Sequence, residues 1–135
     1  MKKRKVEALT DEWSDEDLAR GLGWLRLVLG LVLFFMPRFA TRRWTGDDPA
    51  DAPTDLAVRG MGVRDVAIGA GIVTAVERGA PVRGWLEAAA MVDAGDALGT
   101  LFSWRGLGKP RGVFWFVTEV SFAVLGLSLA ERVDD

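Results

Sequence analysis

Apolar residues along this chain gather into four blocks of about 20 residues each, with shorter polar stretches between them. A helix of about 20 residues is about 30 Å long, which matches the hydrocarbon core of a bilayer. The pattern therefore predicts an all-α fold, an integral membrane bundle of four transmembrane helices with up-and-down topology. The predicted spans cover residues 21–39, 57–76, 85–104 and 112–130, inside a transmembrane domain at 18–130.

The first block carries the strongest indication of a membrane. Its centre, Leu27–Met36, is apolar on every side of a helix, and a chain of 135 residues has little protein with which to surround it. A soluble bundle with a tryptophan-filled core is the alternative, but each of its helices would need a polar face with a 3.6-residue period. The first block lacks that face, which favours the membrane.

The six tryptophans give an independent indication of a membrane. In an up-and-down bundle three of them fall near each end of the helices and none falls at mid-span, as aromatic belts do at the two membrane surfaces. One group is Trp13, Trp24 and Trp85, and the other is Trp44, Trp104 and Trp115.

Local signals predict where the first helix begins and ends. Ser14 and Asp17 have the spacing of a capping box, so we expect a helix start near Asp15. Pro37 is expected to end or kink that helix. Residues 40–56, with several aspartates, glycine and proline, are typical of a polar loop.

Similar signals bound the later helices. Thr54 is the expected N-cap of the second helix, Gly79 its expected end, and Pro81 prevents its continuation. Pro110 suits the first turn of the fourth helix.

The ends of the chain bear on its location. Residues 1–17 form a polar N-terminal segment and residues 131–135 a C-terminal tail. The acidic stretch 11–17 separates the basic cluster Lys2–Lys5 from the apolar block, which argues against a cleaved signal peptide. Basic residues divide almost evenly between the two sides, so the Lys2–Lys5 cluster alone favours cytoplasmic termini in a multi-pass protein of the plasma membrane.

Charged residues inside the predicted spans are the main candidates for function. A charge at the centre of a bilayer costs at least about 2.5 kcal/mol, so these residues should face the bundle interior and pair. Their heights on alternating helices predict one buried polar network, or ligand or ion site, of two arginines and four carboxylates. Its members are Arg26, Arg64, Asp65, Asp93, Asp96 and Glu119.

The excess of acids in this network has a chemical consequence. Two cations cannot neutralise four carboxylates in a medium of low dielectric, so either a carboxylate keeps its proton or a cation joins the group. A purely structural lock between helices is the other interpretation, because small membrane proteins use polar side chains to hold helices together.

Composition excludes several kinds of chemistry. Cysteine and histidine are both absent, which removes Cys/His metal sites, His-ligated haem and Ser-His or Cys-His catalysis. We therefore expect no catalytic residue, no metal and no cofactor. The formal net charge of -2 gives no basic excess, so nucleic acid is not an expected partner.

Small residues are expected to let the predicted helices approach one another. Gly95 and Gly99 form a GxxxG motif, and Gly71 lies in a four-residue repeat of small side chains near Gly69. Such residues allow close contact between backbones in membranes.

Three segments together resemble the DoxX-like group of small four-helix bacterial membrane proteins, in its uncharacterised branches. They are residues 18–30, the stretch RGMGVRDVAIG at Arg59–Gly69, and DAGDAL at Asp93–Leu98. The resemblance covers about residues 18–130 and implies a four-helix transmembrane bundle of the bacterial inner membrane. Some members of the group are linked to quinone or sulfur redox chemistry, and most have no assigned activity.

Three functions follow as hypotheses. We expect a small integral membrane protein that is a binding or accessory subunit of a membrane complex, without enzymatic activity. The alternatives are a small proton- or cation-coupled transporter that uses Asp93, Asp96 and Glu119, and a membrane enzyme or redox component that acts on a quinone or a lipid. The expected partners are the bilayer, other membrane subunits or further copies of the chain, and a lipid or quinone ligand.

Overall fold

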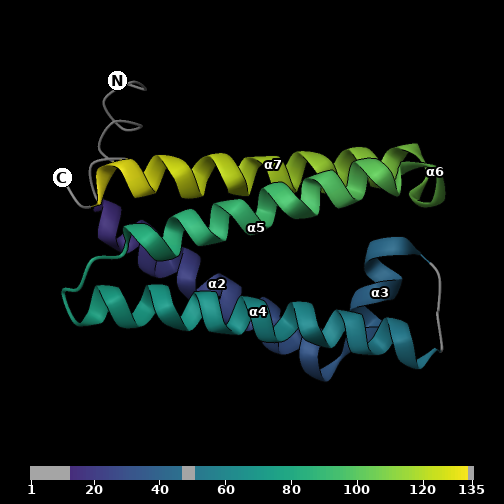
Figure 1. The fold of residues 1–135 in the computed structure, drawn as a ribbon, viewed down its shortest axis with the longest axis horizontal. Helices are drawn as coiled ribbons and strands as arrows, with labels where there is room; N and C mark the ends of the chain where they lie inside the picture. The colour runs from purple at the N-terminus through teal and green to yellow at the C-terminus, as the bar shows by residue number, and fades with distance from the viewer. Residues whose placement is uncertain (1–12, 47–50, 134–135) are drawn as a thin grey trace, which may run out of the picture.

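The computed structural model describes residues 13–46 and 51–133, and these residues are all-helical between turns, with no strand (Figure 1). The predicted all-α fold is therefore confirmed. The basic cluster at residues 2–5 lies outside the described residues. The helices are α2 (Asp15–Phe35), α3 (Pro37–Thr45), α4 (Ala52–Glu77), α5 (Arg83–Phe102), α6 (Trp104–Leu107) and α7 (Lys109–Arg132).

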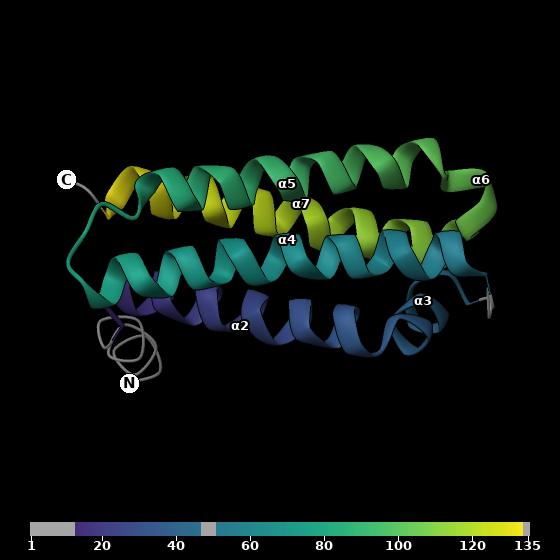
Figure 2. The same cartoon turned by 60° about the horizontal axis from the view of Figure 1, so that its bottom comes forward.

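The four long helices pack as two pairs. Helix α2 lies along α4, and α5 lies along α7, so that the pairs face each other across the centre of the bundle (Figures 1 and 2). Successive long helices run in opposite directions. The short helices α3 and α6 therefore lie at one end of the bundle, and the α4–α5 turn lies at the other.

Helix α2 begins as its sequence predicts. The Asp17 backbone amide donates to the Ser14 hydroxyl at 3.1 Å, and the Asp17 carboxylate accepts from the Ser14 backbone amide at 3.3 Å. This reciprocal capping box satisfies two amides that have no partner within the helix. The helix ends at Phe35, ahead of Pro37, also as predicted.

The segment after Pro37 differs from the predicted polar loop. Residues Pro37–Thr45 form α3, because proline has the φ of a first helical turn and needs no amide partner there. Gly46 ends α3 with φ +83°, a conformation that favours glycine.

The predicted N-cap of α4 is wrong by three residues. Asp51 is the cap, and its carboxylate accepts a hydrogen bond of 2.7 Å from the Thr54 backbone amide, which lowers the pKa of Asp51. Thr54 lies inside the first turn. The other boundaries hold: Gly79 has φ +58° just after α4 ends, and Pro110 lies in the first turn of α7.

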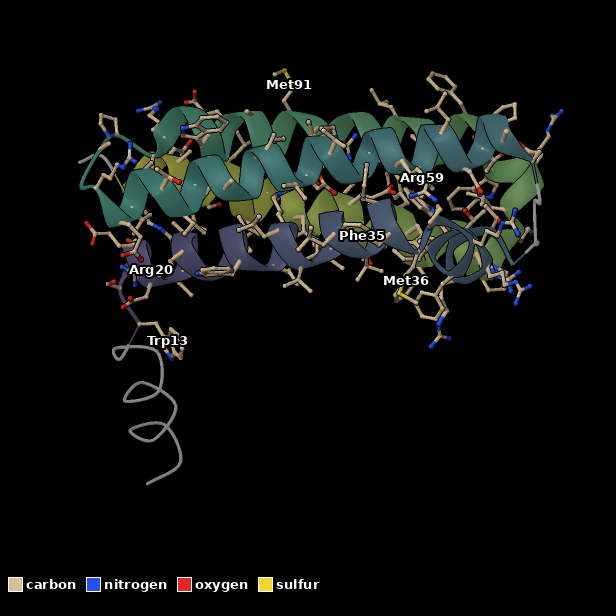
Figure 3. The ribbon with its side chains drawn as sticks, turned by 90° about the horizontal axis from the view of Figure 1, so that it is seen from below. Trp13, Arg20, Phe35, Met36, Arg59 and Met91 are labelled. Atoms are coloured by element: carbon tan, nitrogen blue, oxygen red, sulfur yellow. The ribbon has the colours of Figure 1, made fainter. Side chains whose placement is uncertain are left out.

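The outside of the bundle is strongly apolar. By length and composition, helices α2 and α7 could cross a membrane. Only 28% of the apolar 18-residue stretch of each helix is buried. Met91 on α5 and Met36 after α2 project outward (Figure 3), with 72% and 52% of their surface exposed.

Candidate functional site

Arg26 of α2 joins three helices near the middle of the bundle. Its side chain is 7% exposed and makes ion pairs with Asp65 of α4, at 3.1 Å, and with Asp93 of α5. The same guanidinium donates to the backbone carbonyl of Ala89 at 3.4 Å. Arg26 thus binds two carboxylates from facing helix pairs with one buried positive charge.

Arg64 of α4 makes a second connection between the pairs. Its Nη1 and Nη2 donate to Oδ1 and Oδ2 of Asp96 at 3.0 and 2.8 Å, a two-pronged contact that fits the planar guanidinium. Nη2 also lies 3.5 Å from Asp65 Oδ1. Asp65 therefore links the two arginines, and five of the six predicted residues form one network of ion pairs.

Glu119 of α7 lies apart from this network. Its two carboxylate oxygens accept hydrogen bonds from the Thr100 hydroxyl of α5, at 2.8 and 3.1 Å. Both residues are buried, with 8% and 4% of their surface exposed. None of the ion pairs among residues 13–46 and 51–133 includes Glu119. Its charge is met by a neutral hydroxyl.

Glu119 and two acids of the ion-pair network line one cavity of about 260 Å³. Its walls come from α2 and α7, one end from α3, and Asp65 and Asp93 also line it. The remaining lining residues are mainly apolar: Leu29, Val32, Leu33, Ala40, Arg43, Trp44, Met61, Trp115, Thr118 and Phe122.

Two tryptophans form the α3 end of this cavity. The Trp115 Nε1–H donates to the backbone carbonyl of Trp44 at 3.2 Å, and the ring centroids are 5.4 Å apart. This contact fixes α3 against α7. The site therefore has apolar and aromatic walls and a polar side made of carboxylates.

The chemistry available to these residues is binding and charge pairing. No group of three or more metal-ligating side chains occurs within the described parts of the chain. The buried Nε atoms of Arg26 and Arg64 have no hydrogen-bond partner there. With all groups ionised, the two arginines and three aspartates leave one negative charge, and Glu119 adds another.

The predicted packing glycines are placed differently from one another. A Cβ added to Gly69 would lie 2.6 Å from the Gly23 carbonyl oxygen of α2, and one added to Gly71 would collide with the Trp85 ring. Gly95 and Gly99 are exposed on α5, where an added Cβ would meet nothing within 4 Å. The described helices therefore make no close contact at the GxxxG motif.

Sequence reasoning missed several residues of the site. Thr100 carried no signal beyond a hydroxyl in an apolar block, and its role depends on lying opposite Glu119. Trp44 and Trp115 were expected at the same membrane surface, but their mutual contact and their place beside the acids needed the fold.

Comparison with known proteins gives no further guide: no protein family, curated protein or solved structure was found to match this chain.

Proposed function

We propose that this chain is a multi-pass membrane protein in which α2, α4, α5 and α7 each cross the bilayer. The apolar exteriors of α2 and α7 support this proposal directly. The proposal includes the plasma membrane as location, cytoplasmic termini, and membership of the DoxX-like group, for which the three sequence patterns are the support.

Among the described helices, α4 and α5 do not meet the criterion of length and composition that α2 and α7 meet, and each has charged residues within its apolar stretch. Arg64, Asp65, Asp93 and Asp96 all take part in the ion-pair network. The exposed positions between Leu56 and Thr74 of α4, and between Met91 and Phe102 of α5, hold no charged residue. A helix can cross a bilayer with such charges when they face protein and pair.

Topology can be tested directly because the chain has no native cysteine. The exposed residues Ala52 and Ser103 lie at one end of the bundle and Ala80 at the other. Single variants Ala52→Cys, Ser103→Cys and Ala80→Cys would be treated with a membrane-impermeant maleimide in sealed vesicles of both orientations. We expect the first two to react from one side and Ala80→Cys from the other. Reaction of all three from one side would contradict four spans.

Within the membrane, we propose that the protein binds a small molecule with an apolar body in the cavity between α2 and α7. The observation that carries this proposal is the combination of apolar and aromatic walls with buried carboxylates in one hollow of about 260 Å³. Binding suits a subunit of a membrane complex that holds a ligand for its partners.

A cavity-filling variant tests the binding proposal. Val32 lines the cavity, whereas Val28 on the same helix is 55% exposed and does not. Binding of small aromatic compounds would be measured by equilibrium dialysis against protein-free micelles. Val32→Trp should abolish saturable binding, and Val28→Trp, the matched control, should retain it. Equal binding by both variants would contradict a ligand site in this cavity.

One observation favours transport of a proton or a cation as a second function. Glu119 faces the cavity, while Thr100, its hydrogen-bond partner, lines a second hollow of about 310 Å³ together with Asp96. Carboxylates thus lie on both sides of the Glu119–Thr100 pair. Proton or cation flux into liposomes that contain the purified protein tests this function, and its absence across a range of imposed gradients would contradict it.

A further inference from the structure

We infer that the ligand of this cavity is a cation with an apolar body, such as an organic ammonium ion, and that Glu119 binds its charge. The inference rests on the proposed binding function and adds to it the chemical class of the ligand. It depends on how charge is distributed around the cavity, on the burial of Glu119, and on the nature of the walls.

The acids that line the cavity differ in whether a cation pairs with them. Asp65 and Asp93 both face the cavity, but both pair with the buried guanidinium of Arg26. Asp96 is held by both terminal nitrogens of Arg64. Glu119 is the cavity acid that has no cation beside it among the described residues, so it is the group that a cationic ligand would meet.

The Glu119 carboxylate is buried with little to compensate its charge. An ionised carboxylate away from water is strongly unfavourable unless a cation or several hydrogen bonds compensate it. Glu119 is 8% exposed, and the Thr100 hydroxyl gives it one proton to share between two oxygens. When Glu119 is ionised, the hydroxyl does not neutralise its charge. A positive charge in the cavity would neutralise it.

The walls of the cavity are aromatic and apolar. Trp115 and Phe122 stand on the same helix as Glu119, one turn before and one turn after it, and Trp44 closes the α3 end. Aromatic faces attract organic cations, most strongly at sites that exclude water. Leu29 and Val32 offer apolar surface to the rest of the ligand.

One basic residue also touches this cavity. Arg43 of α3 belongs to its lining, but it is an exposed residue at the end of the bundle. Water and salt screen the charge of such a residue far more than that of a buried carboxylate. The buried side of the cavity therefore holds one carboxylate, that of Glu119, without a paired cation among the described residues, which disfavours an anionic ligand.

A pair of probes with the same shape isolates the contribution of charge. Benzyltrimethylammonium has a permanent positive charge, and neopentylbenzene replaces its nitrogen by carbon. Binding of each to the full-length protein would be measured by equilibrium dialysis against protein-free micelles. We expect the cation to bind at least tenfold more tightly than the neutral compound. Glu119→Gln should remove this preference while the neutral compound binds as before.

Glu131 provides the matched control for that substitution. It lies on the same helix, is exposed, and lies outside the cavity lining. Glu131→Gln should keep the preference for the cation. Thermal unfolding of each variant establishes that it is folded before binding is compared.

The outcomes separate the two proposals. If the neutral compound binds the parent protein as tightly as the cation, the ligand class is wrong and the binding site stands. If Glu119→Gln keeps the preference for the cation, Glu119 is not the group that binds its charge, and the binding site again stands. If neither probe binds saturably in a manner that Val32→Trp abolishes, the binding function itself is contradicted.

Discussion

Gly30 of α2 and Gly62 of α4 face each other so closely that a Cβ added to either would lie 2.6 Å from the carbonyl oxygen of the other. Two turns away, a Cβ added to Gly69 would lie 2.6 Å from the Gly23 carbonyl oxygen, and one added to Gly23 would lie 3.1 Å from that of Gly69. The two glycines of each helix are seven residues apart, and α2 and α4 run in opposite directions. Because glycine has no side chain, the two backbones can touch at both heights.

Substitution at Gly62 should therefore weaken the α2–α4 pair. In Gly62→Ala the new methyl group would meet backbone atoms of Gly30 and Phe34, so the helices must separate. Overpacking of this kind costs about 1–3 kcal/mol. We expect a lower unfolding temperature in detergent.

Gly60→Ala is the control for that variant. Gly60 lies two residues before Gly62 on α4 and is exposed, and a Cβ added to it would meet nothing within 4 Å. Alanine forms helix better than glycine by about 1 kcal/mol, so this variant should be as stable as the parent or more stable. Equal losses in both variants would show that the close contact at Gly62 is not what stabilises the pair.

The glycines show how far the sequence could predict the packing. A GxxxG motif at Gly95 indicated a helix contact that the described residues do not make. The seven-residue spacing of Gly23 and Gly30, matched on α4, was visible in the sequence, but its meaning depends on which two helices are neighbours. Local spacing identifies a surface able to make close contact and leaves its partner undetermined.

Arg26 should be the most sensitive member of the ion-pair network. Arg26→Met would leave Asp65 and Asp93 without their shared buried cation, and loss of one partner from a buried ion pair costs about 3–5 kcal/mol. We expect a large drop in unfolding temperature. The triple variant Arg26→Met, Asp65→Asn, Asp93→Asn should regain much of it, since it also removes the two carboxylates that Arg26 had balanced. A triple variant no more stable than the single one would argue against charge as the cause.

Arg64 should respond to the shape of its replacement. Arg64→Ala removes both hydrogen bonds to Asp96 and should destabilise the bundle, though less than Arg26→Met, because the Arg64 side chain is 30% exposed. Arg64→Lys should restore only part of the loss, because an ammonium group cannot donate in parallel to both carboxylate oxygens. Thermal unfolding in detergent measures both. Full rescue by lysine would mean that charge alone matters at this position.

The charged residues show a second limit of the sequence. Equal heights on alternating helices predicted that six charges would meet near mid-bundle, and the structure brings five of them into ion pairs. Height along the bundle axis does not specify direction around it. Glu119 lines the cavity and hydrogen-bonds to Thr100 instead of joining the ion pairs, and this contact depends on how α7 is rotated against α5.

Asp96 and Glu119 should therefore respond oppositely to the same chemical change. Asp96→Asn takes away the anion that holds both terminal nitrogens of Arg64, so a half-buried guanidinium keeps only the longer contact to Asp65 and stability should fall. Glu119→Gln removes a buried charge that no cation compensates, while its amide oxygen still accepts from the Thr100 hydroxyl. Its stability should equal or exceed that of the parent.

Thermal unfolding of the two variants side by side tests this contrast, and proton or cation flux into liposomes tests their function. A Glu119→Gln protein that is more stable and inactive would identify Glu119 as a residue kept for function at the expense of stability. An equal loss of stability in both variants would place Glu119 among the structural ion-pair residues.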